Sequence, residues 1–155
     1  MRHINQKDIY DLQKKKLAPL SNRELEIAGL FLYWGEGYKS LRGPVGISNS
    51  NPKVIKFSIY WLTNIYKVPP EKIKIRLQLY KDMDTNQEIE YWMKQGGCSK
   101  SNFRNPYYKN SLQSNLTYKK GFGHGTCDIF VNDRALLEKI LMGTEAIADF
   151  YCSRI

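Results

Sequence analysis

The clearest hydrophobic pattern of the chain is the strict alternation of residues 71–80, EKIKIRLQLY. Apolar side chains at every second position place one face of a strand in a core and leave the other face to solvent. The outward positions contain no acidic residue, and they are Lys72, Lys74, Arg76, Gln78 and Tyr80. The pattern therefore predicts a strand with one buried face and one basic, polar face.

A second pattern, SNRELEIAGLFLYWGEG at residues 21–37, has apolar positions at helical spacing. Ser21 and Glu24 form a capping box, which satisfies free backbone N–H groups of the first turn. The apolar stripe continues into Glu36, an acid between two glycines. Because an unpaired carboxylate is costly to bury, we expect Glu36 to have a partner: a metal ion, a basic group or a second copy of the helix.

Shorter periodic stretches predict the remaining elements of a single domain. The other predicted helices cover residues 5–16, 53–66 and 84–95, with a last helix after Asn132 or Asp133. The other predicted strands cover residues 44–50 and 126–131. We expect an α+β fold in which helices cover one face of an antiparallel sheet and leave a basic face open. Residues 1–20 form a basic N-terminal arm, and residues 21–155 form the domain.

Charge and aromatic content favour a polyanionic partner. The 155 residues include 24 Lys and Arg against 15 Asp and Glu, a formal net charge of +9, and eleven Tyr. No basic amphipathic helix stands out, so nucleic acid is favoured over a membrane surface. A solvated basic surface without such a partner is the alternative.

The cysteine and hydropathy patterns indicate a cytoplasmic protein with no membrane partner. Cys98, Cys127 and Cys152 are far apart and form no CxxC pair. Neither a zinc site nor a disulfide framework is suggested, and a reducing compartment fits. No apolar run approaches the length that spans a membrane.

Residues 91–127 contain no Asp or Glu, and their basic side chains alternate with aromatic ones. Such a mixture suits a surface that contacts phosphates and bases, and an ordinary long loop is the alternative. The basic residues of this stretch are Lys94, Lys100, Arg104, Lys109, Lys119, Lys120 and His124.

The sequence IAGLFLYWGEG, at residues 27–37, resembles the motif of LAGLIDADG homing endonucleases in the variant that ends Gly-Glu-Gly. Taken in order, YWGEG, SNSNP, EKIKIRLQLY, FRNPYYK and HGTCDIFV resemble a bacterial and phage subfamily of these proteins. Members of that subfamily often carry a helix-turn-helix ahead of the domain, and residues 1–20 are too few for one. The resemblance covers about residues 21–150.

The resemblance implies an α-β-β-α-β-β-α fold and the activity of a DNA endonuclease. In the family two such units form a saddle with the motif helices at its centre, so this single-motif chain is expected to form a homodimer through residues 21–37. The open sheet face lies in the major groove of double-stranded DNA, at a near-palindromic site. Glu36 occupies the position of the acid that binds Mg²⁺ or another divalent cation, which activates water for phosphodiester hydrolysis.

These expectations define the candidate site residues. The candidate catalytic residues are the metal-binding Glu36 with Lys119, Lys120 and His124 as phosphate or water contacts. The candidate DNA contacts are Lys39, Arg42, Lys72, Lys74, Arg76, Gln78, Tyr80, Arg104 and Lys109.

Several positions depart from the family pattern. Phe31 replaces a small residue, Trp34 stands where a second acid is common, and the first hairpin shrinks to about residues 38–43. On the last strand the outward positions are Asp128 and Phe130 rather than basic residues. Two alternatives to the Mg²⁺-dependent endonuclease therefore stay open. One is a non-catalytic DNA-binding regulator of the same fold, and the other is a maturase-like RNA binder supported by the tyrosines.

Overall fold

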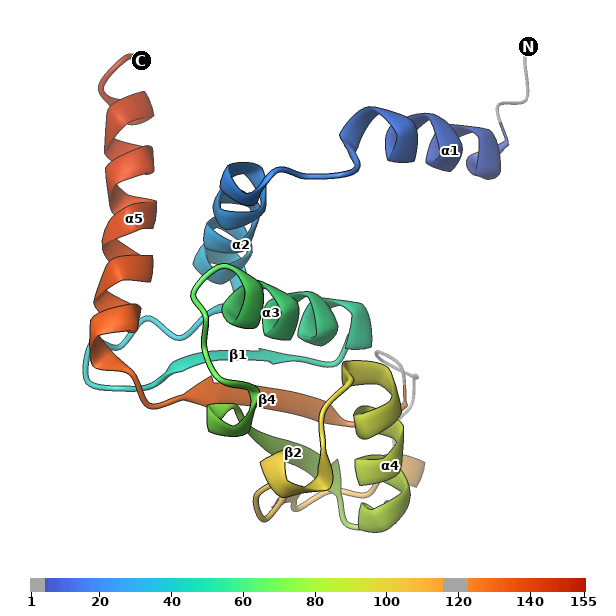
Figure 1. Ribbon diagram of the computed structural model, residues 1–155. Coiled ribbons are helices and arrows are strands. Elements are labelled where there is room, and N and C mark those ends of the chain that lie inside the picture. The colour runs from blue at the N-terminus through green and yellow to red at the C-terminus, as the bar shows by residue number, and fades with distance from the viewer. Residues whose placement is uncertain (1–4, 116–122) are drawn as a thin grey trace.

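The computed structural model describes residues 5–115 and 123–155, and they form an α+β fold, as the sequence predicts (Figure 1). The helices are α1 (Gln6–Leu17), α2 (Asn22–Glu36), α3 (Pro52–Asn64), α4 (Thr85–Gly96) and α5 (Arg134–Cys152). The strands are β1 (Val45–Asn49), β2 (Lys74–Tyr80), β3 (Tyr107–Lys109) and β4 (Thr126–Val131).

The four strands form one sheet in the order β1-β4-β2-β3. Strand β4 pairs antiparallel with both β1 and β2, whereas β3 pairs parallel with β2. The prediction of a wholly antiparallel sheet is therefore wrong at this edge. The connection from β2 to β3 passes through α4, and a crossover of this kind returns the chain in the same direction. Apolar and polar residues do not alternate along β3, and its two neighbouring tyrosines, Tyr107 and Tyr108, are both exposed.

The core lies between the helices and one face of the sheet. Ile75, Leu77 and Leu79 of β2 are at most 1% exposed, whereas Arg76 between them is exposed, which confirms the predicted alternation. Helices α2, α3, α4 and α5 bury apolar side chains in the same cluster. Within residues 5–115 and 123–155, the other face of the sheet carries no helix (Figure 1).

Helix α2 begins as predicted and packs closely against α3. Ser21 Oγ accepts the Glu24 N–H at 3.2 Å, and Glu24 Oε2 accepts the Ser21 N–H at 2.7 Å, which completes the capping box. Farther along, Gly29 faces the indole of Trp61, and a Cβ at position 29 would lie 2.0 Å from Trp61 Nε1. This glycine therefore allows α2 to approach α3 of the same chain.

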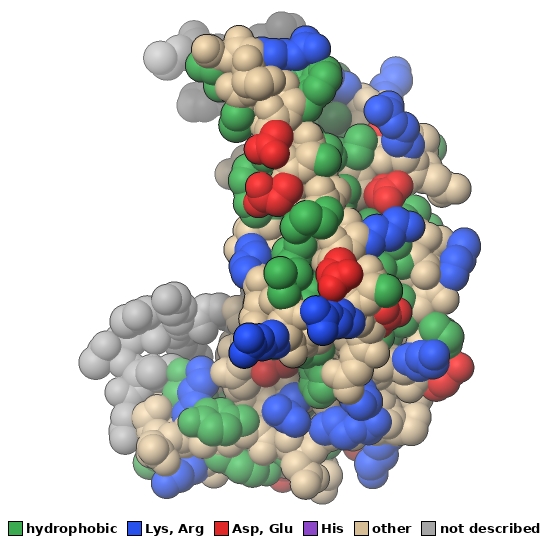
Figure 2. Space-filling model, turned by 90° about the vertical axis from the view of Figure 1, so that its left-hand side faces the viewer, with side chains coloured by type: hydrophobic (Ala, Val, Ile, Leu, Met, Phe, Trp, Pro, Cys, Tyr) green, Lys and Arg blue, Asp and Glu red, His purple; other side chains and the backbone are tan. Residues whose placement is uncertain are grey.

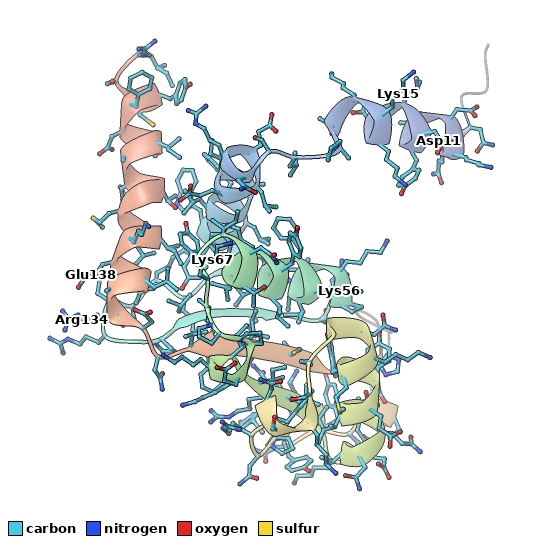
Figure 3. The ribbon with its side chains drawn as sticks, in the orientation of Figure 1. Asp11, Lys15, Lys56, Lys67, Arg134 and Glu138 are labelled. Atoms are coloured by element: carbon cyan, nitrogen blue, oxygen red, sulfur yellow. The ribbon has the colours of Figure 1, made fainter. Side chains whose placement is uncertain are left out.

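Helix α1 extends away from the rest of the molecule (Figure 1). None of its residues is buried. Its last turn carries three consecutive lysines, of which Lys15 is labelled in Figure 3. The helix therefore adds basic charge at a distance from the sheet and contributes nothing to the core.

Candidate nucleic-acid interface

Glu36 lies exposed in the last turn of α2. The predicted continuation of the apolar stripe into Glu36 is wrong, because the buried residues of α2 end at Tyr33. Because the carboxylate is exposed to solvent, it needs no partner to offset a cost of burial. Its partner is a side-chain amide, since Asn49 Nδ2 donates a hydrogen bond to Glu36 Oε2 at 3.2 Å.

Asn49 is a site residue that the sequence interpretation missed. Its Oδ1 accepts the Asn51 N–H at 2.8 Å, and this contact orients the amide nitrogen toward Glu36. Asn49 falls within the SNSNP segment, where Asn51 caps α3. Two asparagines so close to a helix start indicate capping and turn formation, and only the fold shows that one of them reaches α2.

The end of α2 is held to β1 by a buried phenol. Tyr33 is fully buried, and its hydroxyl donates to the Tyr38 carbonyl at 2.8 Å and accepts the Gly46 N–H at 3.2 Å. Burial raises the pKa of Tyr33. Beyond the helix an isolated bridge pairs Gly37 with Ile47. These contacts hold the end of α2 against β1 and thereby fix the position of Glu36, the last residue of the helix.

The outward face of the sheet brings together side chains from three strands. In one row Ser48, Asp128 and Arg76 lie side by side, and in the next row Thr126 lies beside Gln78. Asp128 is 8% exposed, although it lies on the face without a helix. Its carboxylate accepts hydrogen bonds from Ser48 Oγ and from Gln78 Nε2, and the latter lies 2.9 Å from each carboxylate oxygen.

Aromatic rings hold the basic side chains of this face in place. The Arg76 guanidinium lies 5.5 Å from the centroid of the Phe130 ring, and Lys109 Nζ lies 4.8 Å from that of Tyr80. Such cation–π contacts keep the charges close to the sheet while leaving them hydrated. Lys74 lies beside Phe130 in the next row. The outward face therefore carries five of the predicted DNA contacts, which are Lys74, Arg76, Gln78, Tyr80 and Lys109.

Tyr38 covers one corner of the same face. A Cβ on Gly46 would lie 2.4 Å from the Tyr38 ring, so glycine leaves the space that the ring fills. Burial, and next the negative charge of Asp128, raise the pKa of Tyr38 to about 12. The phenol is therefore neutral near pH 7 and can act as a hydrogen-bond donor.

Four predicted DNA contacts lie outside this outward face. Lys72 belongs to the turn at Pro70–Lys72 before β2, and Arg104 Nη1 donates to the carbonyls of Ser101 and Phe103. Lys39 donates to the Gly37 carbonyl and lines a groove with Trp34 and Met142. Arg42 lines a hollow with Asn132 and Arg134 near the start of α5.

His124 is held by α4. Its Nδ1 lies 2.9 Å from Glu88 Oε2, and its ring stacks on Tyr91 with centroids 3.6 Å apart. Its backbone carbonyl accepts the Trp92 indole N–H at 3.0 Å. In the described parts of the chain no hydrogen bond connects His124 with Glu36, so the structure does not bring these two candidate catalytic residues into contact. Lys119 and Lys120 lie outside the described residues.

Exposed apolar side chains lie along α2 and α5, and two of them precede Glu36 on α2. Phe31 is 42% and Trp34 48% exposed, and their rings meet edge to face at 5.6 Å. Met142, Phe150 and Tyr151 of α5 are each more than half exposed. In Figure 2 hydrophobic side chains gather at mid-height, while most of the visible Lys and Arg side chains lie in the lower half. We call the five side chains the α2–α5 apolar surface.

Neither a preassembled metal cluster nor a membrane span is found in the described residues. No group of three or more His, Cys, Asp or Glu side chains there could hold a metal ion together. No helix in the same ranges is long and apolar enough to cross a membrane. No protein-family model, curated protein or solved structure matches the chain.

Proposed function

We propose that this chain is a DNA-binding protein of the LAGLIDADG type that acts as a homodimeric, divalent-cation-dependent DNA endonuclease. The observation that carries the DNA-binding part is the outward face of the sheet, where Lys74, Arg76 and Gln78 lie with no helix over them in the described residues. Basic side chains bind phosphates and position a protein on the duplex, whereas polar side chains on the same face read base edges.

The order of the elements supports the LAGLIDADG assignment. Helix α2, strand β1 and helix α3 follow one another, and an isolated bridge at Gly37 stands where the expected order has its first strand. Strands β2 and β4 and helix α5 complete the expected order, with α4 and β3 inserted between the two strands. The bridge corresponds to the shortened first hairpin that the sequence indicates.

The α2–α5 apolar surface supports a homodimer. Exposed rings such as Phe31 and Trp34 gain free energy when a partner removes them from water. A second copy related by two-fold symmetry presents the same surface and therefore matches it. Phe31 and Trp34 then become contact residues between protomers instead of obstacles to helix packing.

The Glu36 carboxylate is a suitable ligand for a hard divalent cation, and in a homodimer the second protomer would contribute its own Glu36 to the same site. Mg²⁺ needs only one or two protein carboxylates, because waters and phosphate oxygens complete its coordination. Within one chain the Oε1 atom of Glu36 has no hydrogen-bond partner in the described residues, whereas Asn49 holds Oε2. A bound cation would supply an activated water and neutralise charge on the phosphate. The roles of this chain are to hold the carboxylate through Asn49 and to fix the helix end through Tyr33.

Fluorescence anisotropy with labelled duplex DNA tests the DNA-binding part. The expected affinity of the wild type falls steeply between about 50 and 200 mM salt, and the Lys74→Ala/Arg76→Ala variant loses about two units of the logarithmic salt slope. Lys53→Ala/Lys56→Ala is the matched control, since both lysines are exposed on α3 (Lys56 is labelled in Figure 3). A flat salt response, or an equal loss in the control, would contradict the proposal.

One observation favours a second candidate, a non-catalytic regulator of the same fold. Among the residues that the structure describes, Asn49 contacts one carboxylate, that of Glu36, and this hydrogen bond by itself can serve to join α2 to β1. A regulator would keep salt-dependent, site-specific binding and show no cutting in Mg²⁺. Cleavage of a bound duplex therefore separates the two functions.

A further inference from the structure

A small pocket lies on the outward face of the sheet, at the end opposite Lys74. Its volume is about 270 Å³, and residues from all four strand ends contribute to its walls. Tyr80 is the last residue of β2 and pairs with Lys109 of β3, Thr126 begins β4, and Ser50 follows β1. We call this space the Lys109 pocket.

Lys109 gives the pocket a positive charge that no acid offsets. Its Nζ lies 4.8 Å from the centroid of the Tyr80 ring, and this cation–π contact holds the ammonium at the wall. In the described ranges His124 and Arg134 are the basic residues that form ion pairs, so Lys109 has no carboxylate partner there. Neither Asp nor Glu is among the described residues that line the pocket. A half-buried ammonium without a counter-ion favours an anion and repels a metal cation.

Three side chains with hydroxyl groups, those of Ser50, Tyr80 and Thr126, line the same space. In the described parts of the chain none of these hydroxyls forms a hydrogen bond within the protein. Lys, Ser, Thr and Tyr side chains are the usual donors to phosphate oxygens. A phosphate carries several oxygens in a tetrahedral arrangement, so it can accept from donors on different strands at the same time.

The walls of the pocket are held by contacts within the protein. Gln113 Nε2 donates to the Gly123 carbonyl at 3.0 Å, and the Gln113 N–H donates to Asp82 at 2.7 Å. Gly125 has a φ of +71°, and a Cβ there would lie 2.5 Å from the Gln78 carbonyl oxygen, so glycine lets this wall run directly against β2. The pocket is therefore formed before any ligand enters, which lowers the cost of binding.

We propose that the Lys109 pocket binds a single phosphate group. Two sources share this chemistry, the backbone of duplex DNA and free inorganic phosphate. Binding of a backbone phosphate rests on the proposed function, and it would set the position of the duplex along the sheet, because phosphate contacts position a protein without reading sequence. Binding of free phosphate does not rest on that function.

NMR spectra recorded with inorganic phosphate test the pocket without DNA. The backbone amide signals of Gly125 and Thr126 are expected to shift saturably, and chloride at equal ionic strength is expected to leave them in place. Lys109→Gln should weaken phosphate binding about tenfold or more, because it removes a charged donor. Tyr80→Phe keeps the ring beneath the ammonium and should weaken binding less. Lys56→Gln, at an exposed lysine on α3, is the control and keeps the wild-type affinity.

Duplexes with one neutral methylphosphonate at a time test the DNA source. A duplex recovered by binding-site selection is used, and fluorescence anisotropy measures its affinity. One substitution in each half-site should weaken binding by the wild type about tenfold, since a charge-assisted hydrogen bond is lost. The same substitution should leave the affinity of Lys109→Gln unchanged, because its partner is already absent.

The outcomes separate this inference from the proposed function. Saturable phosphate binding that depends on Lys109, or a methylphosphonate position that couples to Lys109, supports the pocket and identifies the source. The inference is overturned when neither is observed. Absence of duplex binding by the wild type at low salt overturns the proposed function, and the phosphate titration then decides on the pocket. Circular dichroism establishes that Lys109→Gln is folded, and if it is not, Tyr80→Phe decides in both experiments.

Discussion

At the scale of single residues, Gly29 shows where the sequence leaves no freedom. The Trp61 indole fills the space that a side chain at position 29 would need. Gly29→Ala is expected to destabilise the fold by about 1–3 kcal/mol through overpacking. Gly35→Ala is the matched control, because a Cβ there has no neighbour within 4 Å, and it should be neutral or gain a few tenths of a kcal/mol from helix propensity. Urea denaturation of both variants measures the difference, and equal stabilities would contradict the packing account.

Tyr38 gives a prediction about pH. Its pKa of about 12 in the folded state exceeds the ordinary value near 10, so the folded state keeps its proton longer than the unfolded chain. Stability from this residue is therefore complete below pH 10 and is lost as the pH rises toward 12. Unfolding free energies of wild type and Tyr38→Phe, measured across this range, should show a smaller decline in the variant. Parallel curves would refute the assignment.

Residue patterns predicted some contacts and missed others for a physical reason. The capping box at Ser21 and the alternating burial of β2 depend on neighbours a few positions away, and both are confirmed. The contacts of Asn49 with Glu36 and of Gln78 with Asp128 join residues 13 and 50 positions apart. No local spacing encodes them, because strand register decides which polar side chains meet.

At the scale of elements, the α2–α5 apolar surface predicts self-association. Phe31→Glu should raise the dimer dissociation constant by about thirtyfold or more, because a charge would have to be buried with the ring's former neighbours. Ile9→Glu is the control, since Ile9 is 46% exposed, close to the 42% of Phe31, but lies on α1. Sedimentation velocity over a concentration series measures both. A monomeric wild type at all concentrations would rule out the interface.

Helical elements were easier to predict than the sheet edge. The helices after β1 and β2 begin at Pro52 and Thr85, directly after Asn51 and Asp84, whose side chains accept backbone N–H groups as N-caps. Strand β3 has only three residues, and its direction depends on the crossover through α4. A short edge strand with two exposed tyrosines carries no periodic signal, so tertiary pairing alone defines it.

At the scale of the whole molecule, α1 is separable from the folded body. Because none of its residues is buried, removal of residues 1–17 should change the free energy of unfolding by less than about 0.5 kcal/mol. The same truncation removes the lysines of the last turn and should weaken DNA binding at low salt more than at high salt. Thermal denaturation and anisotropy titrations measure the two effects. A large loss of stability would show that α1 packs against the body.

Plasmid cleavage tests most directly the proposal that the sheet binds DNA and that Glu36 acts with a divalent cation. The substrate is a supercoiled plasmid carrying a site recovered by selection, incubated with Mg²⁺ and with wild type or Glu36→Gln. The wild type is expected to give nicked or linear plasmid with Mg²⁺ and none without it, and Glu36→Gln is expected to bind the site without cutting it. Intact plasmid with bound wild type, or equal cutting by Glu36→Gln, would contradict it.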